Sequence, residues 1–209
     1  MKKNNLIITL LLLSTTLFAL DIENTFINMP NALLPVLKRQ QRMELIEYYK
    51  ADSATDSITN VFGKESRISF FDKEKQHLKL QTTPSTTFEL FIFQLDTTKL
   101  SVIGVIRTVC APVCHSSVVF YDSEWRIVPT PFVIPKTTEW VDTDNLAKDE
   151  NASVFVQPFL AVSFISLQFD AETATLAASN NNLDFLNKEE REKALPFVKQ
   201  EAIKVKKSL

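Results

Sequence analysis

The first third of the chain places its apolar residues with a helical period. Two stripes have the i, i+1, i+4 spacing of amphipathic helices: Leu33, Leu34 and Leu37, then Leu45, Ile46 and Tyr49. Asn31 can cap a helix that begins at Ala32, and Pro35 then falls in the first turn, where a missing amide proton does no harm. The segment from Asp52 to Asn60 is rich in Ser, Thr and Asp, which predicts a loop.

From Arg67 to Val128 the period changes to that of strands. The predicted strands are Ile68–Phe71, His77–Thr82, Thr86–Leu95, Leu100–Val109, Ser117–Tyr121 and Trp125–Val128. Short polar turns join them, among them Asp96–Lys99 and Asp122–Glu124. Parallel strands need a long crossover, so strands joined by such short turns must run antiparallel. The pattern therefore predicts a β-meander.

The strand that begins at Thr86 is apolar on both faces. Its two sets are Phe88, Leu90 and Ile92 on one face, and Phe91, Phe93 and Leu95 on the other. The segment from Val102 to Ile106 is likewise apolar on both faces. We therefore expect the middle of the sheet to be covered on both sides, by helices, by a second sheet or by a partner chain.

After the prolines at 129, 131 and 135 the pattern resumes with a long predicted strand over Phe159–Phe169 and a second strand over Thr173–Ala178. Asn187 followed by Glu190 has the form of a capping box and opens a short helix to about Leu195. Residues 203–205 can add a brief terminal strand. We therefore predict an α+β fold, an antiparallel β-meander packed by N-terminal helices and a C-terminal strand–strand–helix unit, in one domain over residues 21–209.

The first twenty residues have the order of a secretory signal peptide. Lys2 and Lys3 precede an apolar run from Leu6 to Leu17, and Ala19 offers a small residue for cleavage next to Leu20. The run is shorter than the roughly 18 residues of a membrane-spanning helix. We expect cleavage after residue 19 or 20, export to the periplasm or beyond, and no membrane span in the mature chain. A retained N-terminal anchor is the alternative.

Composition excludes several classes of function. The formal net charge is −2, and loss of the two signal-peptide lysines takes it to −4, so there is no electrostatic reason to bind nucleic acid. The chain has only two glycines, Gly63 and Gly104. Phosphate-cradling loops need several glycines, so neither a P-loop nor a dinucleotide fingerprint can form. We expect no cofactor.

The only cysteine pair is Cys110 and Cys114, at the end of a predicted strand. In an oxidising compartment a pair this close is most simply a disulfide that closes a tight loop, stabilising the fold by about 2 kcal/mol. Two free thiols and a catalytic redox pair are the alternatives. The redox motif has two intervening residues and opens a helix, whereas here three residues intervene and the flanks are strands.

Histidine offers little support for catalysis. His115 directly follows Cys114, and neighbours in an extended chain point to opposite sides, which works against a Cys–His dyad. His77 lies on the polar face of its strand, and we expect it to be exposed to solvent. The cysteine and histidine spacing matches no standard zinc site, and the stretch from Asp142 lacks the glycine and closing glutamate of a calcium loop. We predict neither catalytic residues nor metal ligands.

Phenylalanine is abundant, with 16 residues. A curved sheet can use such side chains to line an apolar ligand pocket, and the candidates are Phe88, Phe91, Phe93, Phe159, Phe164 and Phe169. Phe is also an ordinary core residue, and core packing is the simpler interpretation.

Several segments resemble a known family. They are Phe26–Pro30, Leu33–Leu37, Phe62–Ser66, Thr108–Pro112 and Phe120–Trp125. Together they are similar to an uncharacterised family of secreted Bacteroidetes proteins, domain of unknown function 3256. The resemblance covers most of the mature chain and implies export and a single domain. It implies no activity and no catalytic residue.

Three functional hypotheses follow. The first is an exported, non-catalytic envelope protein that binds or scaffolds an unknown envelope protein or ligand. The second is an envelope hydrolase or thiol enzyme that uses Cys110 or Cys114 with His77 or His115. The third is a carrier of apolar ligands. A cleft that joins a cysteine to a histidine would favour the second, and a deep Phe-lined cavity would favour the third.

Overall fold

A seven-stranded antiparallel sheet forms the centre of the computed structural model, which describes residues 20–51, 56–95 and 100–208. The strands follow one another in chain order: β1 (Ser57–Thr59), β2 (Glu65–Asp72), β3 (His77–Thr83), β4 (Thr86–Gln94), β5 (Ser101–Cys110), β6 (Cys114–Tyr121) and β7 (Ile127–Val128). The predicted meander is confirmed. The loop expected over Asp52–Asn60 is wrong in part, because residues 57–59 pair with β2. The expected turn Asp96–Lys99 and the signal segment 1–19 lie outside the described residues.

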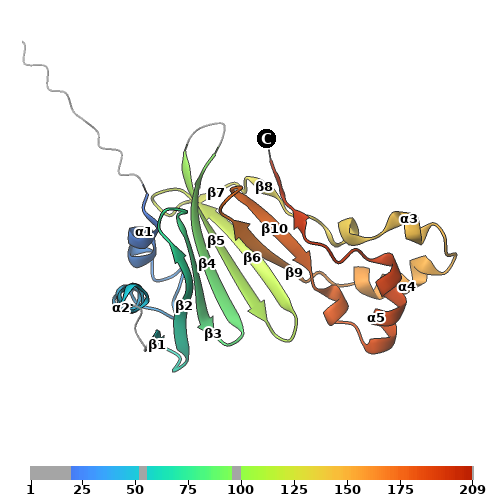
Figure 1. Cartoon of the computed structure of the whole chain (residues 1–209), viewed down its shortest axis with the longest axis horizontal. Coiled ribbons are helices and arrows are strands. Elements are labelled where there is room, and N and C mark those ends of the chain that lie inside the picture. Colours follow the sequence, from blue (N-terminus) through green and yellow to red (C-terminus); the bar gives the residue numbers. More distant parts are fainter. Residues whose placement is uncertain (1–19, 52–55, 96–99, 209) are drawn as a thin grey trace, which may run out of the picture.

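The two faces of this sheet carry separate apolar cores, as the alternation in β4 predicts. Phe88, Leu90 and Ile92 join the core beneath the N-terminal helices. Phe91 and Phe93 join the core on the opposite face. Below, the face of the sheet that carries Phe88 is called the helix face, and the face that carries Phe91 is called the ribbon face. Figure 1 shows the N-terminal helices on one side of the sheet and the C-terminal elements on the other.

Two helices cover the helix face: α1 (Ile22–Asn28) and α2 (Arg39–Lys50). Asp21 caps α1, because its carboxylate accepts a hydrogen bond from the backbone N–H of Asn24 at 3.2 Å. Ile22 and Phe26, four residues apart, are both fully buried. Helix α2 buries Leu45 and Ile46, as its stripe predicts.

The helix predicted from Ala32 is wrong. Residues 31–37 form turns and bends, from which Leu34 and Leu37 enter the core. Isolated i→i+3 hydrogen bonds form in place of a helical ladder, from Leu33 N–H to the carbonyl of Pro30 and from Leu37 N–H to that of Leu34. The Asn31 side chain accepts a hydrogen bond from Arg42 at 3.2 Å instead of capping a helix.

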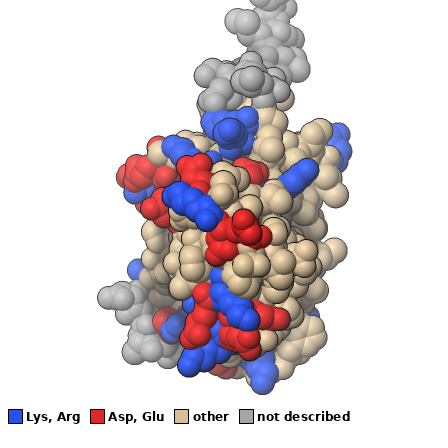
Figure 2. Space-filling model, turned by 90° about the vertical axis from the view of Figure 1, so that its right-hand side faces the viewer, with Lys and Arg blue, Asp and Glu red and all other residues tan. Residues whose placement is uncertain are grey.

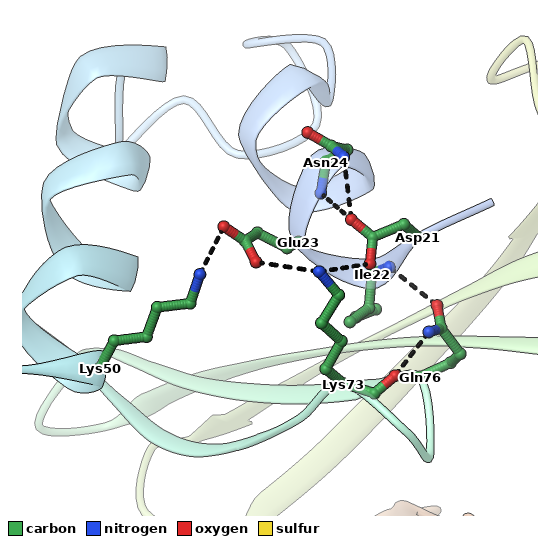
Figure 3. Close-up of polar contacts among 7 residues, drawn as sticks. All are labelled: Asp21, Ile22, Glu23, Asn24, Lys50, Lys73 and Gln76. Atoms are coloured by element: carbon green, nitrogen blue, oxygen red, sulfur yellow. Dashed lines mark hydrogen bonds and ion pairs between the residues drawn. The ribbon is translucent and has the colours of Figure 1, made fainter.

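The start of the described chain is fastened to the turn between β2 and β3 (Figure 3). The backbone N–H of Ile22 donates to Gln76 Oε1 at 2.8 Å. Glu23 forms ion pairs with Lys50 of α2 at 2.7 Å and with Lys73 at 3.6 Å. Helix α1 is therefore held from two directions, by α2 and by the sheet.

The C-terminal elements lie over the ribbon face. Strands β9 (Ile165–Asp170) and β10 (Thr175–Asn180) form a hairpin, called the ribbon below, and β11 (Ile203–Lys204) pairs with the outer edge of β10. Strand β8 (Phe132–Val133) pairs with β12 (Lys206–Lys207). Leu167 and Phe169 of the ribbon pack into the core that contains Phe91 and Phe93.

The long strand predicted over Phe159–Phe169 is wrong in its first half. Residues Ala152–Leu160 form helix α4, whose buried residues Ala152, Val156 and Phe159 have helical spacing, and β9 begins only at Ile165. Short runs of apolar residues do not distinguish a helix from a strand, which explains the error.

The remaining helices lie at the end of the molecule beyond the ribbon (Figure 1). They are α3 (Thr143–Leu146), α5 (Lys188–Ala194) and the 3₁₀ turns Thr137–Trp140, Asn182–Asp184 and Leu195–Phe197. The predicted capping box of Asn187 and Glu190 is confirmed in α5. Within the described residues, no helix combines the length and the apolar character that crossing a bilayer requires.

Candidate functional site

Strand β9 is attached to the central sheet by an unusual arrangement. One edge of β9 pairs with β10, and the backbone N–H groups of its other edge donate to side chains of the central sheet. These bonds run from Ile165 to His115 Nδ1 (3.2 Å), from Leu167 to Ser116 Oγ (2.9 Å) and from Phe169 to Glu89 Oε1 (3.0 Å). Three side chains therefore replace the neighbouring strand that would normally bind this edge.

Glu89 of β4 lies at the end of this series, and its side chain is only 10% exposed. Its Oε1 atom accepts from the Phe169 N–H and lies 2.7 Å from His77 Nε2. The ammonium nitrogen of Lys79 lies 3.7 Å from the same oxygen. The second oxygen, Oε2, accepts no hydrogen bond within the described part of the chain. The described residues do not enclose this atom completely. Oε2 is therefore free to accept a hydrogen bond from outside the fold.

A hollow of about 380 Å³, lined by both polar and apolar groups, lies beside Glu89, and we call it the groove. Strands β3, β4 and β5 supply Lys79, Thr87 and Thr108 to its lining. The ribbon supplies Gln168 and Ser179 from the opposite side. The volume is within the range of small-molecule sites, and hydroxyl and amide groups surround the carboxylate.

A second hollow, of about 340 Å³, lies on the other side of the His77–Glu89 pair. Phe70, His77 and Glu172 contribute to its lining. Lys75 also lines it and forms an ion pair with Glu172 at 2.5 Å, which connects the turn after β2 to the turn of the ribbon. Its hydrogen bond with Glu172 raises the pKa of the Lys75 ammonium above its ordinary value.

His77 is not exposed, contrary to the sequence prediction, because only 4% of its surface is accessible. The alternation of residues along the strand correctly predicts that His77 lies on the same face as Lys79. The ribbon covers that end of the face, so the His77 ring packs between Phe70 and Phe169, with ring centroids 5.1 and 5.4 Å away. A strand about 90 residues further along the chain causes the burial, and no local pattern indicates it.

The structure joins Cys110 and Cys114 by a disulfide at the tip of the β5–β6 hairpin. His115 is exposed, and its Nδ1 atom accepts from the Ile165 N–H. No hydrogen bond within the described residues connects His77 or His115 to either sulfur atom. The structure thus brings His77 together with Glu89 rather than with a thiol.

The phenylalanines proposed as a pocket lining pack mostly against one another. Phe91 stacks on Phe169 with ring centroids 3.9 Å apart, and Phe93 contacts both Phe120 and Phe132. The candidates at 88, 91, 93, 159 and 169 are all buried in the two cores. Phe164 is half-buried and packs on Phe185 instead. Among the described residues, no group of three His, Cys, Asp or Glu side chains is arranged to hold a metal ion.

The end of the molecule that carries α3 to α5 has both signs of charge interspersed (Figure 2). Part of this mixture is paired, because Lys193 contacts Glu189 at 2.6 Å and Arg191 contacts Asp184 at 2.7 Å. The hydrogen bond from Lys193 lowers the pKa of the Glu189 carboxyl. This face therefore presents neither a basic nor an acidic patch.

The proteins that this chain resembles have no assigned activity. A domain of an uncharacterized protein from Porphyromonas gingivalis W83 superposes with a TM-score of 0.72 at 22% identity, covering 87% of this chain and 90% of that one. At this identity the likeness shows the fold alone, and the organism supplies the link to Bacteroidetes. No curated protein matches the chain. The family model described as protein of unknown function (DUF3256) matches residues 14–206, and the chain therefore belongs to this family.

Proposed function

We propose that the protein is exported to the cell envelope and acts there as a non-catalytic binding module for a small polar ligand. The observation that carries the binding role concerns Glu89. Its buried side chain lines the groove, and its Oε2 atom accepts no hydrogen bond within the described residues. Carboxylates on buried side chains normally have their oxygens hydrogen-bonded within the protein or to water. An open acceptor held rigidly by its other oxygen is suited to orient a ligand.

The order of charged, apolar and small residues over positions 1–20 supports export. Leu20 is half-buried against the helix-face core, directly after the proposed cleavage position. We expect the protein from cell envelopes to begin within a residue or two of Leu20, which N-terminal sequencing measures. An intact Met1 in a membrane pellet would contradict cleavage and indicate a retained anchor.

Binding accounts for the site better than catalysis does. His77 and Glu89 resemble the base and orienting group of a hydrolase, but within the described residues no hydroxyl or thiol is hydrogen-bonded to the His77 ring. A thiol enzyme would need a free sulfur, whereas both cysteines are bonded to each other. An apolar carrier would need an open Phe-lined cavity, whereas the ribbon-face phenylalanines fill their core.

Ligand-induced thermal stabilisation tests the binding role. The probes are single amino acids, dipeptides, diamines and neutral mono- and disaccharides, each added to the purified mature protein. We expect at least one class to raise the melting temperature, because a ligand that binds only the folded state stabilises it by mass action. The rise should be reduced in Glu89→Gln and unchanged in Glu47→Gln, since Glu47 is exposed on α2, away from the groove. A full panel without any rise would contradict the proposal.

A further inference from the structure

The groove and the second hollow adjoin along the ribbon. Both are lined by Gln168 and Ala177, which are direct cross-strand partners on β9 and β10. These two residues lie on the outer face of the ribbon, opposite to Leu167, Phe169 and the buried core. One elongated molecule can therefore occupy both hollows by crossing this pair.

The charges around Glu89 favour a neutral ligand. Lys79 Nζ lies 3.7 Å from Oε1 and already balances the carboxylate. A second cation at Oε2 would gain attraction from Glu89 but suffer repulsion from Lys79. A neutral hydroxyl that donates to Oε2 has no such penalty, and hydrogen bonds to a charged acceptor are stronger than neutral ones.

Polar side chains with unused hydrogen-bonding capacity line the groove. Thr87, Gln168 and Ser179 make no side-chain hydrogen bonds within the described part of the chain. Between them they offer two hydroxyls and one amide, which donate and accept in several directions. Such a lining complements a molecule with many hydroxyl groups better than one with a single charged group.

An aromatic side chain stands at the other end of this path. Phe70 of β2 lines the second hollow, is 36% exposed and leans against the His77 ring. Its accessible ring is an apolar surface bordered by polar groups. The C–H face of a sugar ring can pack on such a surface while its hydroxyls remain hydrogen-bonded.

We propose that the groove and the second hollow together bind a short neutral oligosaccharide, with one sugar ring on Phe70 and a hydroxyl of another donating to Glu89 Oε2. This inference rests on the proposed binding function and specifies the class of ligand. It needs no chemical step, and the Lys79–Glu89–His77 cluster serves as a fixed polar anchor.

Saturation-transfer NMR and calorimetry with defined probes test the inference. The neutral probes are cellobiose, maltose, xylobiose and N,N′-diacetylchitobiose, and the comparison probes are glycylglycine and putrescine. We expect at least one disaccharide to bind with a Kd of roughly millimolar or below, and both comparison probes to bind more weakly. Phe70→Ala should weaken that disaccharide roughly tenfold, an effect in the range of one aromatic contact.

Two further variants locate the site. Phe62→Ala is the matched control, because Phe62 is 67% exposed on the turn before β2 and lines neither hollow. Gln168→Ala removes an exposed amide at the junction of the hollows without removing any internal hydrogen bond in the described fold. We expect Gln168→Ala to weaken the disaccharide severalfold and Phe62→Ala to leave its affinity unchanged.

The outcomes separate this inference from the broader proposal. Binding of glycylglycine or putrescine without any disaccharide, reduced in Glu89→Gln, would overturn the carbohydrate and retain the binding function. Disaccharide binding that is equal in Phe70→Ala, Gln168→Ala and Phe62→Ala would overturn the placement. Failure of every probe would overturn both.

Discussion

The two faces of the central sheet are covered in different ways. On the helix face, apolar residues of β3, β4 and β5 meet apolar residues of α1 and α2. On the ribbon face, apolar contacts seal the part that carries Phe91, Ile106 and Phe120. The rest of that face is polar and opens into the groove. A sheet can thus be closed for stability on one side and left partly open for a ligand on the other.

The helices and the ribbon that cover the two faces are also held in place by different interactions. Arg42 of α2 is 1% exposed and donates to the backbone carbonyls of Ile27, Met29 and Leu37, so a buried cation anchors the helix side. Burial lowers the pKa of the Arg42 guanidinium, and the charge of nearby Arg39 adds a smaller effect. On the ribbon side, single hydrogen bonds from the backbone of β9 to side chains of the sheet accompany the apolar packing of Leu167 and Phe169. We expect the helix side to tolerate loss of its anchor less well than the ribbon side.

The largest effect is expected for Arg42→Ala. The change removes the donor from three carbonyls, two of them on buried residues, and creates a cavity, so the free energy of unfolding should fall by about 3–5 kcal/mol. Urea unfolding followed by circular dichroism measures it. Arg39→Ala is the control and should cost less than about 1 kcal/mol, because the hydrogen bonds of Arg39 in the described fold are exposed. Equal losses in the two variants would contradict the role of Arg42.

Gly104→Ala tests how tightly the sealed part of the ribbon face is packed. A Cβ atom at Gly104 would fall inside the van der Waals surface of the Phe91 ring, which the stacked Phe169 prevents from moving away. We expect a loss of about 1–3 kcal/mol in the free energy of unfolding. The double variant with Phe91→Leu should lose less than the sum of the single variants, because the smaller side chain makes room. Simple additivity would show that the ring and the glycine are not coupled.

Ser116→Ala removes the central bond of the ribbon attachment. The N–H of Leu167, a buried residue, then lacks its acceptor, and we expect a loss of about 1–2 kcal/mol. Hydrogen exchange at the Leu167 amide should accelerate. Ser117→Ala is the matched control, since Ser117 is exposed and has no comparable bond in the described fold. Unchanged exchange at Leu167 would show that this bond does not hold the ribbon.

Cys110→Ser opens the disulfide at the hairpin tip beside the groove. The closed loop is short, with a sequence separation of 4, so the expected cost is only about 1–2 kcal/mol in the chain-entropy model. Thiol labelling of the native protein without reductant should find no free cysteine. Full labelling of the protein isolated from its own compartment would refute the bridge.

The smallest effect is expected at Asp122, in the turn after β6 and outside both covers. The Arg126 Nε–H donates to its carboxylate at 2.7 Å, which lowers the pKa of Asp122 below its usual range. A lowered pKa in the fold means that the stabilisation is present above the ordinary value and is lost as the pH falls through the lowered one. A carboxyl NMR titration should show the low pKa, and Arg126→Gln should raise it. An identical titration in both proteins would exclude Arg126 as the cause.

The spacing of apolar residues and the local cap and turn signals predicted much of the fold. The two apolar faces of β4 predicted the two cores. The pair Asn187 and Glu190 predicted the start of α5. The errors fell where local signals compete. Asn31 is a good helix cap, but its side chain binds Arg42 instead, and the apolar run at Phe159 is too short to reveal its period.

The candidate site was much less predictable. One signal was present, because Glu89 stands between Phe88 and Leu90 in a strand that is otherwise apolar on both faces over residues 88–93. A charge at such a position is costly unless the fold provides partners for it. Those partners include His77 from the neighbouring strand and the backbone of Phe169, 80 residues away. Only the three-dimensional crossing of β9 over the sheet brings them together.

The side-chain acceptors along β9 also bear on how the protein behaves among its own copies. A free strand edge with unpaired N–H groups is a template on which another chain can add and start an aggregate. Here the donors at Ile165, Leu167 and Phe169 are already occupied, and the outermost strands of the central sheet, β1 and β7, have only three and two residues. A neighbouring molecule therefore finds no free N–H group at these three positions, and this edge of β9 is protected against edge-to-edge pairing.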